Sequence, residues 1–174
     1  MSEELLRIKR RLVENGDKTL AYFETLEPEH WQQQVYTTGS CWSVRHVLAH
    51  FACTEHALVR LMQDSLGGGS GVPGDFDIDA FNEHEVSERE GSSRKQLIDD
   101  FRQARAASVS FVEGLSPEDL ARRAGHPWFG EMQVLDMLKL MYRHNMIHLR
   151  DVRKALETTR PVPHKQVDPP SRGD

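Results

Sequence analysis

The chain has 174 residues and a mass of 19.9 kDa, with 38% hydrophobic residues, 28% charged residues and a formal net charge of −5. These values predict one domain with a core of its own and do not show the basic character of nucleic-acid-binding proteins. We find no apolar run that could span a bilayer, no signal-peptide pattern and, with two cysteines, no disulfide framework. We therefore expect a cytoplasmic protein whose partners include neither nucleic acid nor a membrane.

Four long helices are predicted from apolar residues that recur at helical spacing. The first covers residues 2–26, and Pro28 marks the region where it ends. Ser43 is the expected N-cap of the second, which runs to about Leu66. A capping-box pattern at Ser93 opens the third, which extends to about residue 115, and the fourth covers about residues 131–156.

The segment between the second and third helices differs in character from the rest. A glycine-rich connector at 67–74 precedes a short predicted helix at 77–90, in which Phe81 faces inward. The connector lacks the Gly-Lys-Ser/Thr ending of a phosphate-binding loop. The alternating aspartates at 75–79 lack the glycine and the glutamate that a calcium loop requires. We therefore expect a long crossover and reject both kinds of ligand loop.

A faint internal repeat indicates how the helices are arranged. The sequence Leu-Glu-Pro-Glu at 26–29 is similar to Leu-Ser-Pro-Glu at 115–118, and each follows one long helix and precedes another. The predicted fold is all-α: a four-helix bundle with one long crossover between helices 2 and 3, built from two helical pairs related by a pseudo-two-fold axis. Residues 1–157 are assigned to the bundle domain and residues 158–174, which include four prolines, to a Pro-rich C-terminal tail.

The main functional signal is a pair of histidines on the last helix. His144 and His148 are four residues apart, so both imidazoles lie on one helical face, the face that also carries Met137 and Met141. Neutral imidazoles in a core are difficult to satisfy by hydrogen bonds alone, and a shared cation meets the need. His50, on or beside the buried face of the second helix, is the expected third metal ligand.

Several nearby residues leave alternatives open. His46 forms another four-residue pair with His50, but it lies in the first turn of its helix and we expect it to be exposed. Cys53 is either a soft fourth ligand or, as we prefer, a small buried cysteine. Glu55 and Asp151 could each orient an imidazole or form a surface ion pair. The other histidines lie at predicted loops, ends or polar faces and are not expected to bind metal: His30, His56, His84, His126 and His164.

The sequence Trp-Ser-Val-Arg-His-Val-Leu-Ala-His at 42–50 resembles the second-helix signature of the DinB/YfiT-like family, in which a metal-binding histidine occupies the position of His50. The spacing of His144, His148 and Val152 is similar to that of the family's last helix. Residues 76–82 are similar to a crossover segment in the branch that contains mycothiol-dependent maleylpyruvate isomerase. The resemblance covers about residues 1–157. The chain departs from the family pattern at residues 149–151, where it has Leu-Arg-Asp and family members often have Arg-Gly-Gln.

The resemblance implies a four-helix bundle with a three-histidine site for a divalent metal, usually assembled as a homodimer. Zinc or nickel suits such a site, although three histidines do not select one metal. Family members are thiol S-transferases and isomerases that use a low-molecular-weight thiol, metal-dependent hydrolases or damage-inducible proteins.

We therefore expect a divalent-metal-dependent thiol S-transferase or hydrolase that acts on a small electrophilic substrate. The crossover is the expected lid, with Phe81 and Asn82 as candidate substrate contacts. Two alternatives stay open. One is a non-catalytic metal-binding stress-response bundle, in which Cys53 would close the coordination of the metal. The other is a histidine-rich bundle without metal, which requires His50 to face away from the pair.

Overall fold

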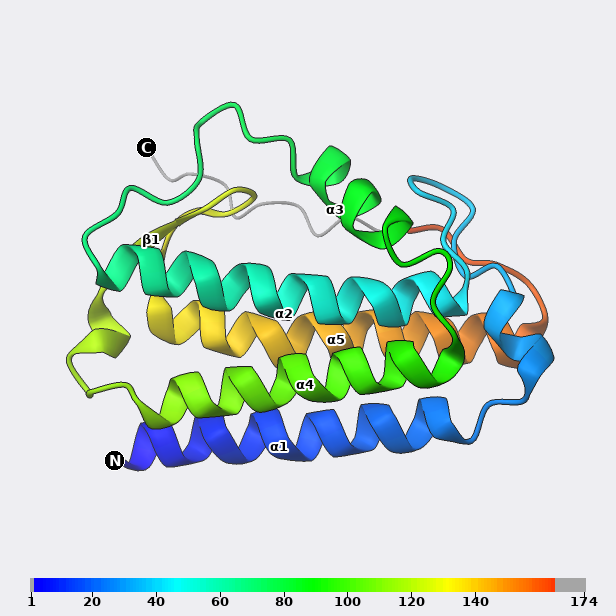
Figure 1. Cartoon of the computed structure of the whole chain (residues 1–174), viewed down its shortest axis with the longest axis horizontal. Coiled ribbons are helices and arrows are strands. Elements are labelled where there is room, and N and C mark those ends of the chain that lie inside the picture. Colours follow the sequence, from blue (N-terminus) through cyan, green and yellow to red (C-terminus); the bar gives the residue numbers. More distant parts are fainter. Residues whose placement is uncertain (1, 165–174) are drawn as a thin grey trace.

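The computed structural model describes residues 2–164, and four long helices form its bundle (Figure 1). They are α1 (Glu3–Glu24), α2 (Val44–Leu66), α4 (Arg94–Glu113) and α5 (Val134–Thr158), and α3 (Ile78–Ser87) is a shorter helix in the crossover. The turns η1 (Pro28–Gln32) and η2 (Asp119–Ala121) and a hairpin of β1 (Arg123–His126) and β2 (Gly130–Gln133) complete it. The predicted all-α four-helix bundle with a long crossover is confirmed. No helix in the described range is both long and apolar enough to cross a membrane.

Local sequence determines where the helices begin. The Ser93 side chain accepts a hydrogen bond from the Gln96 N–H at 3.3 Å and starts α4. Ser43 is the N-cap of α2, and its own N–H donates to Nδ1 of His46 at 3.1 Å. Helix α5 begins at Val134, later than expected, because residues 130–133 pair with β1 as an antiparallel strand. The sequence had predicted a loop before this helix.

Each half of the chain has the same order of elements. A long helix, a 3-10 turn at or just after a proline, a short antiparallel pairing and a second long helix occur twice. The pairing before α2 is a single bridge between Gln34 and Ser43, whereas the one before α5 is the β1–β2 hairpin. Each helix of one pair packs against both helices of the other. This arrangement agrees with the two helical pairs that the repeat predicted.

The apolar core consists of two clusters separated by a buried polar layer. One cluster contains Phe51 and Phe101, and the other contains Leu12 and Met137. Between them, α2, α4 and α5 each contribute buried polar side chains, and these define the polar layer: Glu55, Arg105, Ser108 and Asn145. Helix α1 passes Arg105 at Gly16, where an added Cβ would lie 2.8 Å from the Arg105 Cγ.

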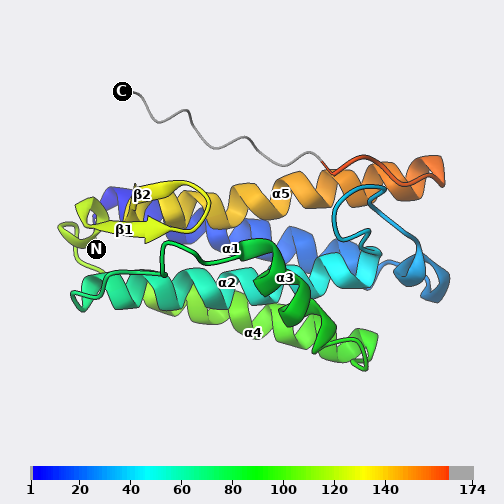
Figure 2. The ribbon, with the colours of Figure 1, turned by 90° about the horizontal axis from the view of Figure 1, so that it is seen from above.

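The crossover places α3 over α2, as both views show (Figures 1 and 2). Trp42 Nε1 donates to Glu83 of α3 at 3.3 Å, and Cys53 Sγ donates to the Glu85 carbonyl at 3.7 Å. The short helix expected at 77–90 is therefore present, and it covers the face of α2 that carries His50.

The described part of the predicted tail, residues 158–164, turns back along the bundle after Thr159, which has a left-handed backbone conformation. Val162 is buried and forms a parallel bridge with Tyr36, and it belongs to the apolar core. Residues 165–174 of that predicted tail lie outside the described residues.

Candidate metal centre

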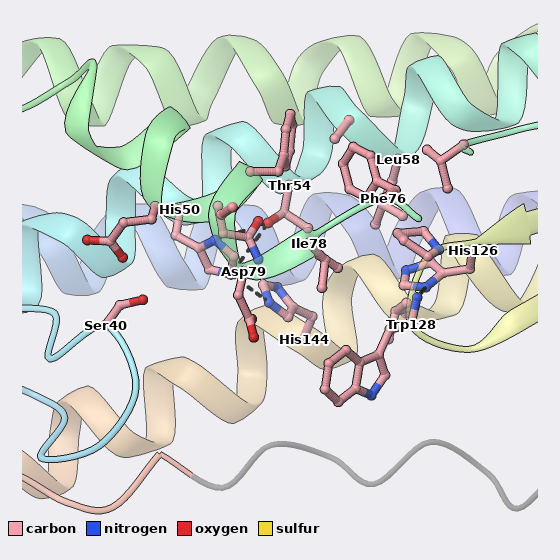
Figure 3. A pocket seen from close by; sticks show the side chains of 18 of the residues that line it. Ser40, His50, Thr54, Leu58, Phe76, Ile78, Asp79, His126, Trp128 and His144 are labelled. Atoms are coloured by element: carbon pink, nitrogen blue, oxygen red, sulfur yellow. Dashed lines mark hydrogen bonds between the residues drawn. The ribbon is translucent and has the colours of Figure 1, made fainter. Parts of the chain in front are cut away.

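Three histidines from two helices converge beside the crossover. Nε2 of His144 lies 3.0 Å from Nε2 of His50 and 3.0 Å from Nε2 of His148. One ring nitrogen from each residue lies within 4.8 Å of those of the other two. Figure 3 shows His50 on α2 facing His144 on α5. The packing of α2 against α5 thus brings the predicted third histidine to the predicted pair, and we call this group the three-histidine cluster.

Burial keeps these imidazoles neutral. His50 is 4% exposed and His148 is 6% exposed. Burial, followed by repulsion from the neighbouring imidazoles, lowers the pKa of both well below the usual 6.5. Burial also lowers the pKa of His144 to about 4. Since a metal binds the neutral form of imidazole, the cluster has the protonation state that coordination needs at physiological pH.

Tyr36 connects His148 to Asp151. The Tyr36 hydroxyl lies 2.5 Å from Nδ1 of His148 and donates to Asp151 Oδ2 at 3.4 Å. Burial and then the charge of Asp151 raise the pKa of Tyr36, so the hydroxyl keeps its proton. In the tautomer that metal binding through Nε2 requires, the hydroxyl donates to Asp151 and its oxygen accepts from the Nδ1–H of His148. The Nε2 of this imidazole is then unprotonated and faces the cluster, in the orientation that an outer carboxylate gives to metal-binding histidines.

A second chain of hydrogen bonds orients His144. Asn145 Nδ2 donates to Glu55 Oε1 at 3.1 Å, which leaves Asn145 Oδ1 to accept from Nδ1–H of His144 at 3.3 Å. Glu55 is held by Arg105, whose Nε donates to its two carboxylate oxygens at 2.8 and 3.0 Å, and by Ser108 at 2.8 Å. Glu55 therefore acts on the site through Asn145 from the polar layer and forms no surface ion pair.

These outer hydrogen bonds provide a test of whether the cluster fits a metal. When both His144 and His148 carry their proton on Nδ1, their 3.0 Å contact pairs two nitrogen lone pairs with no hydrogen between them. A cation bound by both nitrogens removes this repulsion. Tetrahedral coordination with Zn–N bonds of about 2.0–2.1 Å separates nitrogens by about 3.3 Å. This separation is close to the two 3.0 Å contacts of His144, and all three ligand nitrogens lie within 4.8 Å of one another. The donor set therefore fits a divalent metal that prefers imidazole.

The residues that were weighed as further ligands have other partners. His46 is half-buried, and its Nε2 lies 2.7 Å from Glu90 Oε2 while its Nδ1 faces Ser43. Cys53 faces α3, and burial raises the pKa of its thiol to about 11. Among the described residues, neither belongs to the group that could hold a metal.

The cluster opens onto a cavity of about 960 Å³ between α2, α5, the crossover and the hairpin (Figure 3). Phe81 and Asn82, the predicted substrate contacts, are among the residues that line it. His126 and His164 line it as well, although the sequence gave them no role. The position of His126 depends on the unpredicted hairpin. His164 stacks on His148 at 5.5 Å only because the chain turns back after α5, and no signal in the sequence indicated this.

Fold and site together define a class of proteins. Its members are four-helix bundles with a long crossover, and a three-histidine cluster between the second and last long helices could hold a metal. Residues 11–152 match the model of the DinB superfamily, and the chain belongs to this superfamily. The family resemblance that the motifs carried is thereby confirmed.

Solved structures share this fold at low sequence identity. YfiT from Bacillus subtilis, described as a probable metal-dependent hydrolase with an unusual four-helix bundle topology, matches with a TM-score of 0.73 and 16% identity over 92% of this chain and 91% of its own. The mycothiol-dependent maleylpyruvate isomerase matches with a TM-score of 0.72 and 15% identity over 87% of this chain and 63% of its own. An uncharacterised Escherichia coli UTI89 protein matches with a TM-score of 0.70 and 14% identity, over 93% of this chain and 98% of its own. No curated protein sequence matches the chain.

Proposed function

We propose that the protein is a divalent-metal-dependent enzyme, a hydrolase or thiol S-transferase, that acts on a small electrophilic substrate with His50, His144 and His148 as metal ligands. The observation that supports this most directly is an open set of three nitrogen donors on the wall of a large cavity. Catalytic metal sites have three protein ligands and leave a position for water or substrate, whereas structural sites are closed by a fourth ligand. Zinc and nickel are the metals that we would test first.

Each part of the site has a separate task in this proposal. A divalent cation would supply Lewis acidity, lowering the pKa of a bound water or thiol so that a nucleophile is available at neutral pH. Tyr36 and Asn145 hold the proton-bearing Nδ1 of the two α5 imidazoles and so keep their Nε2 atoms available. Helix α3 covers the cavity and limits access of bulk water, and its Phe81 and Asn82 contact the substrate.

The names of two structural neighbours support the two reaction types. YfiT is called a probable metal-dependent hydrolase, and the maleylpyruvate isomerase is called mycothiol-dependent. A low-molecular-weight thiol is therefore the cosubstrate that we propose for the transferase reaction. We also propose a homodimer, for which light scattering should give twice the chain mass of 19.9 kDa.

Metal analysis of purified wild-type protein and of three single variants tests the proposal. After metal depletion and titration with Zn²⁺ or Ni²⁺, wild type should bind one ion per chain, and His50→Ala, His144→Ala and His148→Ala should each bind at least about 100-fold more weakly. His56→Ala is the matched control, because His56 is an exposed histidine on the same helix as His50. If wild type binds no better than the three variants, the proposed metal site is wrong.

Activity is the second part of the test. The metal-loaded protein is assayed with chromogenic aryl esters and with a panel of low-molecular-weight thiols against an aryl halide. Turnover that disappears on chelation and returns with metal supports the enzyme. Tight metal binding without turnover of any panel member favours a non-catalytic metal-binding bundle, and a fourth protein ligand in the metal-loaded structure would establish it.

A further inference from the structure

The hairpin places one more histidine at the cavity, in a fixed tautomer. His126 is the last residue of β1 and is 8% exposed. Its Nδ1 accepts hydrogen bonds from the backbone N–H groups of Trp128 at 3.1 Å and Phe129 at 3.2 Å. A ring nitrogen that accepts hydrogen bonds carries no proton, so the single proton of the neutral imidazole is on Nε2.

This Nε2–H group is available to a ligand. Within residues 2–164, no side chain or backbone group is hydrogen-bonded to Nε2 of His126, and the atom is not one of the fully enclosed polar atoms that lack a partner. Nε2 is therefore accessible, and His126 lines the cavity, where Figure 3 shows it at the hairpin end beside Trp128. Burial, and next the neighbouring imidazole of His144, lower the pKa of His126 to about 4. His126 thus offers the cavity one N–H donor without a charge.

The surroundings of this donor are mostly aromatic and apolar. The ring of Phe129 lies 5.0 Å from that of His126, and Phe76, Phe81 and Trp128 line the same cavity. The charged lining residues are exposed and include one cation and three carboxylates: Arg60, Asp64, Asp79 and Glu83. Anionic ligands are therefore disfavoured, and an uncharged aromatic ligand can bury its surface. In such surroundings an unpaired N–H donor discriminates strongly between a ligand that carries an acceptor and one that lacks it.

We propose that the Nε2–H of His126 is the hydrogen-bond donor for a carbonyl oxygen of an uncharged aromatic substrate held in this cavity. Neutral imidazoles with an N–H directed at a carbonyl serve this role in other enzymes. The assignment deepens the proposed function, since that carbonyl compound is the electrophile of the same site. The hydrogen bond itself requires no metal, so it can be tested separately from metal binding.

Two substitutions separate the donor from the structural role of the ring. His126→Asn keeps a side-chain oxygen near the position of Nδ1, where it can accept the hairpin N–H groups. Its amide N–H groups then lie near the position of Cδ2, one ring atom short of the Nε2 donor, so no donor remains at the Nε2 position. His126→Gln keeps an N–H near the position of Nε2 and removes the acceptor for the hairpin. A role in ligand recognition is lost in the first variant and kept in the second, whereas a merely structural role follows the opposite pattern.

The probes are 2-acetylnaphthalene, which carries a carbonyl oxygen, and 2-isopropylnaphthalene, which has nearly the same shape without it. Affinities are measured by equilibrium dialysis with chelator and again with Zn²⁺. We expect His126→Asn to weaken binding of the ketone by about tenfold and leave binding of the hydrocarbon within about twofold, as for loss of one hydrogen bond. We expect His126→Gln to keep most of the ketone preference. Equal effects on both probes, or no binding of either probe to wild type, would overturn the proposal.

A measurement on wild type keeps the proposal falsifiable if a variant fails to fold. A two-bond ¹H–¹⁵N spectrum of histidine-labelled protein should show His126 with a bare Nδ1 and a protonated Nε2, and the Nε2–H resonance should shift with the ketone and not with the hydrocarbon. The opposite tautomer, or equal shifts with both probes, refutes the assignment. If wild type prefers the ketone in the presence of chelator but binds no metal in the titrations, only the proposed function is contradicted. If wild type shows metal-dependent turnover but does not prefer the ketone, only the role of His126 is contradicted.

Discussion

Replacing Glu55 with glutamine should test the buried ion pair of the polar layer. Glu55 is 1% exposed and Arg105 is 5% exposed, and the carboxylate accepts from Nε and from one terminal nitrogen, Nη2, of the guanidinium. Glu55→Gln keeps the shape of the side chain and removes its charge. The guanidinium cannot lose its proton, so it would remain buried and charged without a counter-ion.

Removing one partner of a buried ion pair costs about 3–5 kcal/mol. This loss is a large part of the roughly 5–15 kcal/mol by which native domains are stable. With a urea m value of roughly 2 kcal/mol/M, the unfolding midpoint should fall by about 1.5–2.5 M. Urea titrations of metal-free protein, followed by far-UV circular dichroism and by tryptophan fluorescence, measure this change.

Asp99→Asn is the matched control, because Asp99 pairs with Lys95 on the exposed side of α4 and its loss should change the midpoint little. Adding Arg105→Met to Glu55→Gln should restore part of the lost stability, since the unpaired charge is removed. If Glu55→Gln shifts the midpoint no more than Asp99→Asn, the buried pair does not contribute as we reason.

Three further predictions concern the site and its support. Tyr36→Phe removes the hydroxyl beside Nδ1 of His148 and should weaken metal binding about 10–100-fold, measured by calorimetric titration. Each imidazole of the three-histidine cluster has a lowered pKa when folded, so the unfolded chain binds more protons below about pH 6.5. Metal-free protein should therefore lose stability as the pH falls from about 6.5 toward 4, by up to about 1.4 kcal/mol per pH unit for each histidine, in urea titrations at successive pH values. Gly16→Ala should lower the unfolding free energy by about 1–3 kcal/mol because its Cβ would meet Arg105, whereas Gly91→Ala, with open space around it, should not.

The sequence was sufficient for the helices and for the cluster because both depend on local periodicity. The spacing of His144 and His148 places them on one face of any helix, and the position of His50 on the buried face of α2 follows from its apolar neighbours. Only the pairing of α2 with α5 had to be assumed, and the internal repeat and the family resemblance supplied it. The roles of these residues as metal ligands stay a prediction until metal binding is measured.

The features that sequence reasoning missed depend on contacts between distant segments. His126 was assigned to a loop because two strands of four residues around a His-Pro-Trp-Phe-Gly sequence have no clear alternation. Arg105 drew no attention because it lies beside the apolar stripe of α4, and only its contact with Glu55, fifty residues earlier, makes it a buried residue. Such partners cannot be identified from periodicity, which describes one helix at a time.

The polar layer also determines how far each helix extends past its neighbours. Two helices that meet only through apolar side chains can shift along each other by one helical turn, since similar side chains recur along both. A slide of α5 by one turn, about 5.4 Å, would withdraw Asn145 from Glu55 and leave buried polar groups without partners. We infer that this layer fixes the axial alignment of α2 and α5. The same alignment brings His50 level with the two histidines of α5. The packing of the core therefore positions the three imidazoles before any metal is bound.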